Sequence, residues 1–240
     1  MVKRKIADVE SPDAVPTTTS PRKKVVASDF LPVDPAILPD DARLDLADAE
    51  IYYIADFIDA KTAKRWYEEL VQLDTWHQPT LRMYGRSFLQ SRQIVAYGDA
   101  KAADSIKYSG TEVPLVKDHP EILKEIQETL EKKLQVRFNH SMLNRYKDGS
   151  VHIGSHSDNL ENLCIASISL GAVRDFILTH KQPRGKDENK ERYRKRFELA
   201  NGSLVIMQGD TQKYWKHEIP KQLKVKEGRI SLTFRQLVDK

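Results

Sequence analysis

The sequence is poor in cysteine and in long apolar runs. Cys164 is the single cysteine among 240 residues, which excludes an intramolecular disulfide and favours a reducing, intracellular compartment. No stretch approaches the roughly 18 consecutive apolar residues that a membrane-spanning helix needs. The first residues also lack the apolar core of a secretory signal. We therefore predict a cytosolic or nuclear protein without a membrane partner.

Charge is close to balanced, and its placement is more informative than its sum. Lys and Arg number 39 against 35 Asp and Glu, and the net charge of +4 permits a polyanionic partner without requiring one. Residues 1–28 are rich in Pro, Ser, Thr and charge, so we expect a disordered tail. Its basic clusters at 3–5 and 21–24 indicate either a nuclear localisation signal or an ordinary solubilising tail. We expect residues 29–240 to form one domain, and a monomer.

Apolar spacing predicts two helices followed by strands. One helix is expected within 57–73, capped by Asp59, and the second within 118–134, with Pro120 in its first turn. We expect this front end to be rich in helix and the basic segment 181–196 to be a mobile loop. Short β-branched and aromatic runs separated by turn residues predict strands within 135–146, 164–170, 175–180, 203–209 and 229–238. The pattern predicts an α+β protein that is mainly β.

Ligand-type side chains concentrate in residues 144–158, "NRYKDGSVHIGSHSD". Its glycines and serines indicate turns or extended chain rather than helix. In a strand, residues two apart point the same way, so His156 and Asp158 present an imidazole and a carboxylate together. His217, which follows a strand-like run, is the best candidate for a third ligand. Two imidazoles and one carboxylate suit a non-haem Fe(II) oxygenase, although His-x-Asp alone is a frequent chance pattern.

The last strand has a polar face of unusual composition. With a period of two, Arg229, Ser231, Thr233 and Arg235 lie on one face of "RISLTFR". The ordinary explanation of such a face is exposure to solvent. Two arginines flanking hydroxyls instead favour a receptor for carboxylates, because guanidinium groups bind them through two parallel hydrogen bonds. A dicarboxylate bound there could also chelate the metal.

Taken together, these motifs resemble the AlkB family of Fe(II)- and 2-oxoglutarate-dependent dioxygenases. The similarity runs from about residue 80 to 237. Three stretches, "NRYKDGSVHIGSHSD", "IASISLGAVRDFILTHK" and "RISLTFR", resemble more narrowly the eukaryotic branch that repairs alkylated double-stranded DNA. The ordered positions are Asn144-x-Tyr146, His156-x-Asp158, His217 and Arg229-x-x-x-Thr233-x-Arg235.

The resemblance implies a fold and a cofactor set. The fold is a double-stranded β-helix, a cupin-like jelly roll over about 135–240, with buttressing N-terminal helices. Iron would be held by His156, Asp158 and His217. The remote carboxylate of 2-oxoglutarate would meet Arg229, and O2 would complete the reaction. The remaining matches to co-substrate positions are Asn144, Tyr146, Thr233 and Arg235.

The implied activity is oxidative dealkylation of 1-methyladenine and 3-methylcytosine in DNA, with formaldehyde release, as part of DNA repair in the nucleus. A buried base must leave the duplex to be reached. The resemblance gives Tyr108 the stacking position and Tyr84 the aromatic finger that fills the gap, while Arg92 could contact phosphate. Asn159 stands where an acidic residue often follows the metal aspartate, which loosens the substrate assignment.

Two alternatives stay open from the sequence. The same oxygenase machinery could act on RNA or on a protein side chain such as that of a histone, because fold does not fix substrate. The chain could also be a non-catalytic nucleic-acid-binding protein on an oxygenase fold, against which the complete set of ligand and arginine positions argues.

Overall fold

The structure is a computed structural model that describes residues 30–83, 86–98, 105–108, 111–158, 162–183 and 190–238. The tail predicted at 1–28 lies outside these residues. No helix of the described part is long and apolar enough to cross a membrane.

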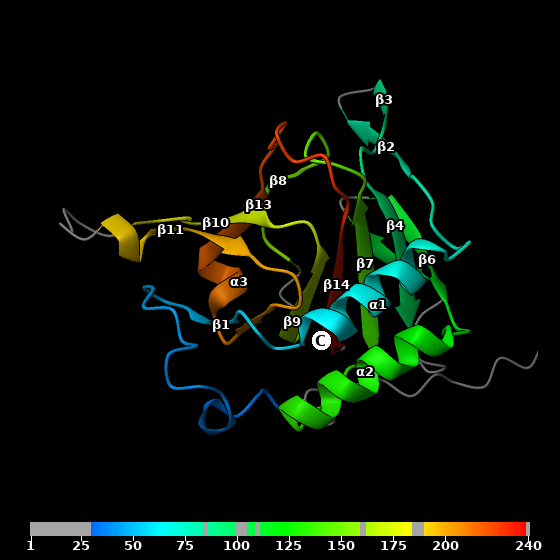
Figure 1. Ribbon diagram of the computed structural model, residues 1–240. Helices are drawn as coiled ribbons and strands as arrows, with labels where there is room; N and C mark the ends of the chain where they lie inside the picture. The colour runs from blue at the N-terminus through cyan, green and yellow to red at the C-terminus, as the bar shows by residue number, and fades with distance from the viewer. Residues whose placement is uncertain are drawn as a thin grey trace, which may run out of the picture.

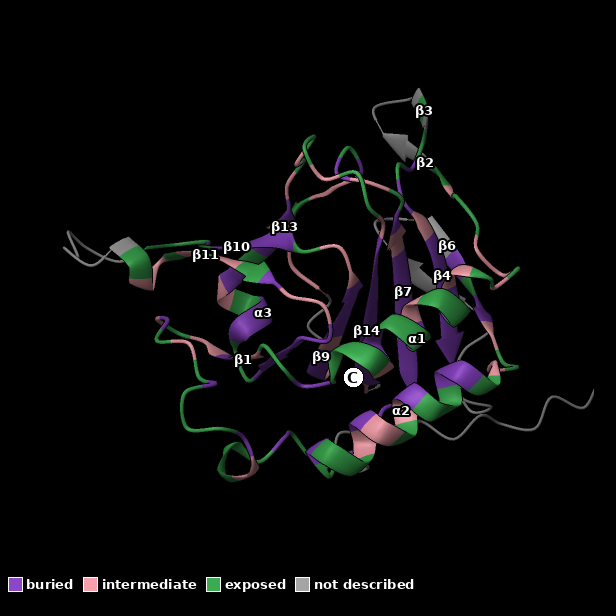
Figure 2. Cartoon of the chain, in the orientation of Figure 1, coloured by how far each residue is buried: buried purple, intermediate pink, exposed green. Residues whose placement is uncertain are grey.

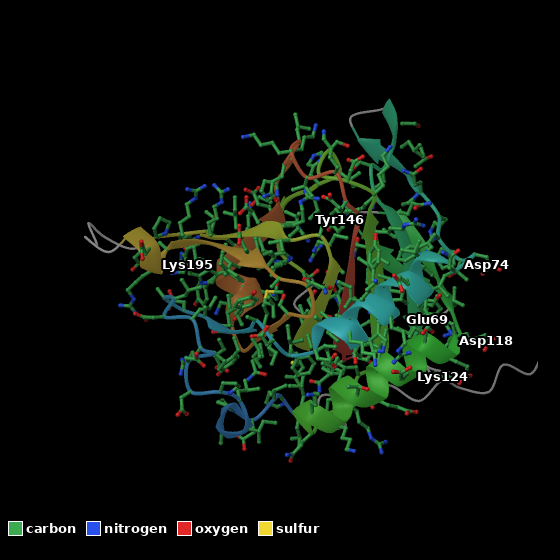
Figure 3. All side chains as sticks on the ribbon, viewed as in Figure 1. Glu69, Asp74, Asp118, Lys124, Tyr146 and Lys195 are labelled. Atoms are coloured by element: carbon green, nitrogen blue, oxygen red, sulfur yellow. The ribbon has the colours of Figure 1, made fainter. Side chains whose placement is uncertain are left out.

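Two helices cover one face of the protein, as the spacing predicted (Figure 1). Helix α1 spans Ala60–Val71, and its N-cap Asp59 accepts hydrogen bonds from the backbone amides of Lys61 and Thr62. Helix α2 spans Glu121–Leu134 and buries its predicted apolar stripe. Pro120 occupies the N-cap of α2 rather than its first turn. Figure 3 labels Glu69 on α1 and Lys124 on α2, which are both exposed.

The strands form two facing sheets of a jelly roll. The large sheet has the order β1-β12-β9-β14-β7-β4-β6-β5, and the small sheet has the order β11-β10-β13-β8. The strands of the jelly roll are β7 (His140–Tyr146), β8 (Ile153–His156), β9 (Asn162–Gly171), β10 (Arg174–His180), β11 (Arg194–Leu199), β12 (Leu204–Gln208), β13 (Trp215–Ile219) and β14 (Arg229–Leu237). The predicted mainly β class and double-stranded β-helix are therefore confirmed.

The front end differs from the expected helix-rich segment. The large sheet continues into strands that precede residue 135, and β4 pairs with β7. A short hairpin, β2–β3, projects from the body of the protein (Figure 1). These early strands are β1 (Glu50–Ile54), β2 (Thr80–Met83), β3 (Arg86–Leu89), β4 (Gln93–Gly98), β5 (Ser105–Tyr108) and β6 (Thr111–Val116). The remaining short elements are helix α3 (Thr211–Tyr214) and the 3-10 turns η2 (Pro35–Ile37) and η3 (Lys190–Arg192).

Part of the basic segment 181–196 is regular structure rather than a loop. Strand β11 begins at Arg194 and pairs antiparallel with β10, with Thr179 opposite Arg194. Residues 184–189 lie outside the described part. The expectation of a mobile loop is therefore wrong for the end of the segment, because its alternating side chains complete the edge of the small sheet.

Strand β14 separates the two halves of the core. Ile230, Leu232 and Phe234 pack with α1 and α2 in one apolar cluster. The alternate side chains face the interior of the jelly roll, so the strand is buried on both faces (Figure 2). The polar face of "RISLTFR" is thus not a solvent-exposed surface, and the commoner explanation of the pattern is excluded.

Gly149 lets two loops approach each other closely. Its amide donates to the carbonyl of Val225, and its carbonyl accepts from the amide of Gln222 at 2.8 Å. A Cβ at Gly149 would lie only 1.9 Å from the carbonyl oxygen of Gln222. The loop after β7 and the loop before β14 are therefore held together by backbone contacts that only glycine permits.

We expect Gly149→Ala to lower the free energy of unfolding by about 1–3 kcal/mol, the usual cost of forcing extra atoms into a packed region. Urea unfolding followed by circular dichroism would measure it. Gly154→Ala is the matched control, since no atom lies within 4 Å of its added Cβ. Equal effects of the two substitutions would contradict the close approach.

Candidate active site

Three ligand-type side chains converge inside the jelly roll. His156 ends β8 and lies opposite His217 of β13 in the sheet register. Asp158 follows β8 by two residues. One ligand atom from each of the three side chains lies within 4.8 Å of the others. His156 and His217, which are 61 positions apart along the chain, thus meet because β8 and β13 pair.

Neighbouring groups orient each of these side chains. His156 Nδ1 lies 2.8 Å from the carbonyl oxygen of Gly154, which can only accept, so Nδ1 carries a proton and Nε2 is the ring nitrogen left for a metal ion. Asp158 Oδ1 accepts from Arg235 Nη2 at 2.9 Å, and its Oδ2 lies 3.9 Å from His217 Nε2. The ring of His217 packs 5.5 Å from that of Phe176.

The protonation states suit a metal ion. Burial lowers the pKa of His217 to about 4; Asp158 opposes the drop, whereas His156 and Arg235 add to it. Burial pushes the pKa of Asp158 up, but the nearby Arg235, His217 and His156 bring it below its usual value. At neutral pH the imidazole of His217 is therefore neutral and the carboxylate ionised, which are the forms that bind metal.

Arg229 offers a cationic receptor beside this group. Arg229 is 2% exposed, and its Nη2 donates to Ser169 Oγ at 2.9 Å. Nε and Nη1 have no hydrogen-bond partner in the described structure. The guanidinium lies 5.2 Å from the centre of the Tyr146 ring. A buried, incompletely paired guanidinium fits a carboxylate ligand, because the ligand would supply the missing acceptors.

A cavity joins the three ligands to Arg229. Residues of both sheets line it. Hydroxyl groups of Ser167, Ser231 and Thr233 line one wall, and Ser167 Oγ lies 3.1 Å from Ser231 Oγ and 3.2 Å from Thr233 Oγ1. Asn144, Tyr146 and Arg235 line the same space. The donor set fits a metal at one end and a diacid across the cavity, so every predicted metal and co-substrate position lies in one place.

The four predicted substrate positions are described less completely. Arg92 is 6% exposed and its Nε donates to Asn144 Oδ1 at 2.8 Å, so it lies behind a predicted co-substrate residue. Tyr84 and Asn159 lie outside the described residues, and the side chain of Tyr108 is not described either. Their roles in substrate binding stay predictions.

Several residues that contribute to the site were not predicted. Gln212 Oε1 accepts from the backbone amide of Asp158 at 2.8 Å, and Phe176 packs on His217. Arg174, which is 1% exposed, bonds to the loops that flank the cavity. Most partners of Gln212 and Arg174 are main-chain groups far away in sequence, which leave no local pattern in the sequence.

His140 is a buried histidine next to the site. It faces Arg235 across the strands β7 and β14, is 3% exposed, and neither ring nitrogen has a hydrogen-bond partner in the described structure. Burial and the charge of Arg235 lower its pKa to about 3, against an opposing effect of Asp158. The folded protein therefore keeps this ring neutral under conditions in which the unfolded chain protonates it.

This lowered pKa predicts a pH-dependent loss of stability. As pH falls below the unfolded-state value near 6.5, only the unfolded state takes up the proton, so stability decreases. Between pH 6.5 and 5 we expect His140 to account for a loss of about 1.5 kcal/mol. Urea unfolding of wild type and His140→Phe at both pH values would measure it. The same pH dependence in both proteins would contradict the assignment.

A jelly roll that holds two imidazoles and one carboxylate on one face of a possible metal position has the ligand set of the non-haem Fe(II) oxygenases. Comparison with known proteins agrees. A family model, the 2OG-Fe(II) oxygenase superfamily, matches residues 50–235. The chain belongs to this superfamily and, within it, to the AlkB family. Fe(II) and 2-oxoglutarate are the cofactors of this class, and the residues present fit both.

The similar proteins include relatives from mammals. DNA oxidative demethylase ALKBH2 from human is 34% identical over 176 residues, covering 71% of this chain and 66% of the relative. The mouse protein of the same name is 34% identical over 179 residues, covering 72% and 73%. Human alpha-ketoglutarate-dependent dioxygenase alkB homolog 3 is 31% identical over 189 residues, covering 75% and 63%. The chain thus spans just under two thirds of the human relatives.

Proposed function

We propose that the protein oxidatively removes N-methyl groups from nucleobases, using Fe(II), 2-oxoglutarate and O2. The observation that carries the proposal is the convergence of His156, Asp158 and His217 beside the incompletely paired guanidinium of Arg229. The similarity to proteins named DNA oxidative demethylase supports the choice of a nucleic acid as substrate.

The bound cofactors supply the oxidation: one oxygen atom enters a C–H bond of the methyl group, the other enters succinate, and carbon dioxide is released from 2-oxoglutarate. The hydroxymethylated base then loses formaldehyde. The protein side chains have other tasks. His156, Asp158 and His217 would hold the metal, and Arg229 would hold the remote carboxylate. Phe176 and Ile219, which line the cavity, limit the access of water.

We further propose duplex DNA that carries 1-methyladenine or 3-methylcytosine as the substrate, nuclear location, and a monomeric enzyme. The names of the relatives support DNA as the substrate, and the basic clusters at 3–5 and 21–24 support a nuclear location. In this proposal Tyr84, Tyr108 and Asn159 contact the DNA, whereas the buried Arg92 supports Asn144 instead of the predicted phosphate. The rival substrates are RNA and a protein side chain, and the rival of another class is a nucleic-acid binder without turnover.

Turnover on a mixed set of substrates tests the proposal. Methylated duplex DNA, single-stranded DNA, RNA and histone peptide would compete at several salt concentrations, with formaldehyde and the repaired bases measured by mass spectrometry. We expect the fastest repair on methylated duplex DNA, with binding that weakens as salt rises. Equal or faster turnover on peptide or RNA would contradict the DNA assignment, and binding without formaldehyde would favour the non-catalytic binder.

A further inference from the structure

Arg174 joins the two loops that close one end of the jelly roll. This residue begins β10, and its guanidinium is buried. Nε donates to Gln222 Oε1 at 3.0 Å, and Nη1 donates to the carbonyl of Asp148 at 3.2 Å. Nη2 donates to the carbonyls of Val151 at 2.9 Å and Pro220 at 2.6 Å. A single side chain thus binds the β7–β8 loop and the β13–β14 loop at once.

These loops continue directly into the strands that carry the site. Strand β7 ends at Tyr146 and β8 starts at Ile153, on either side of the first loop. Strand β13 ends at Ile219 and β14 starts at Arg229, on either side of the second loop. Arg174 therefore fixes the ends of β8, β13 and β14, which carry metal ligands and the predicted carboxylate receptor, and of β7, which carries Tyr146.

Arg174 also acts on the carboxylate end of the cavity through Tyr146. The ring of Tyr146 has the Arg174 guanidinium 5.7 Å from its centre and the Arg229 guanidinium 5.2 Å from it. Neither arginine forms an ion pair with a carboxylate within the described residues. The carboxylates of Asp148 and Asp175 act on Arg174 from a distance, whereas Nε and Nη1 of Arg229 lack a partner in the described structure. The buried, incompletely paired guanidinium of Arg229 favours an anionic ligand at this end of the cavity. Figure 3 labels Tyr146, at the end of β7.

We propose that Arg174 is a positioning residue for 2-oxoglutarate: it holds Tyr146 and Arg229 in the arrangement that receives the remote carboxylate, and it does not touch the ligand. The proposal rests on the co-substrate site proposed above. This role is distinct from metal binding, because the guanidinium of Arg174 bonds to the two loops and not to His156, Asp158 or His217.

Comparing two keto acids tests this role without turnover. Calorimetry would measure the binding of 2-oxoglutarate and of pyruvate to the full chain loaded with Mn(II), a metal that stands in for Fe(II). Pyruvate keeps the keto acid but lacks the remote carboxylate. For Arg174→Lys we expect roughly tenfold weaker binding of 2-oxoglutarate, the scale of one charge-assisted contact. Pyruvate binding should change less than about twofold.

If Arg174→Lys weakens the binding of both keto acids by the same factor, or changes neither affinity, the positioning role is overturned. If Arg174→Lys does not fold, Gln222→Met can replace it, because it removes one acceptor of the Arg174 guanidinium and keeps the charge of the arginine. We expect Gln222→Met to weaken 2-oxoglutarate binding by a smaller factor than Arg174→Lys, and pyruvate binding less still. An equal change in the binding of both keto acids would count against the proposal. Arg194→Lys, at an exposed position of β11, is the control. Arg229→Met tests the site itself: unchanged 2-oxoglutarate binding there would show that the proposed co-substrate site had failed.

Discussion

We expect Asp158→Ala to lower formaldehyde release by at least about 100-fold, because even groups that only support a metal ligand are commonly worth 10–100-fold. The substitution removes the single anionic group of the three and leaves Arg235 without its 2.9 Å partner. The effect falls on metal binding, so binding of methylated DNA should be retained. Formaldehyde assays and fluorescence anisotropy with labelled DNA would measure the two properties.

Asp158→Asn provides the sharper comparison, since it keeps the shape of the side chain and removes its charge. Asp41→Ala, at an exposed position remote from the three ligands in sequence, controls for the loss of an acidic residue. Retained turnover with lost DNA binding in Asp158→Ala would reverse the assigned role, and the metal position would have to be sought elsewhere.

Arg229→Met should raise the KM for 2-oxoglutarate by about 100-fold. Truncating one partner of a buried, hydrogen-bonded charge pair costs about 2–5 kcal/mol, and each 1.4 kcal/mol corresponds to a factor of ten. The methionine fills a similar volume, so the cavity wall should survive. Steady-state kinetics with varied 2-oxoglutarate at saturating DNA would give the value.

The matched control for this arginine lies on the same strand. Arg235 bonds to Asp158 rather than facing the ring of Tyr146, so Arg235→Met should weaken metal binding as well as co-substrate binding. Arg229→Met should leave the affinity for Mn(II) unchanged. A parallel loss of Mn(II) binding in both variants would show that Arg229 supports the metal centre instead of the diacid.

Sequence patterns were sufficient where a residue's role depends on its immediate neighbours in the chain. Asp59 as a helix cap and the apolar stripe of α2 follow from spacing alone. The alternation of "RISLTFR" placed Arg229 and Arg235 on one face, and the structure puts that face inside the jelly roll. The meeting of His217 with His156 needed the pairing of β13 and β8, which the family resemblance supplied and periodicity could not.

The rest depended on long-range packing. Strand β1 follows an acidic segment and pairs with β12, some 150 residues away, so the early strands went unrecognised. Arg174 and Arg92 look like surface cations in the sequence, yet both are buried. Three backbone carbonyls and a Gln oxygen accept from Arg174, and an Asn oxygen accepts from Arg92. Such partners carry no signal of charge or spacing. The β1 pairing and the burial of both arginines were therefore visible only in three dimensions.

The visible absorption spectrum of the protein under anaerobic conditions tests the central claim most directly. When Fe(II) and then 2-oxoglutarate are added, we expect a charge-transfer band that appears with wild type and is absent from Asp158→Ala. A wild-type protein that binds both additions and shows no such band, or a variant that shows the same band, would contradict a ferrous centre at His156, Asp158 and His217.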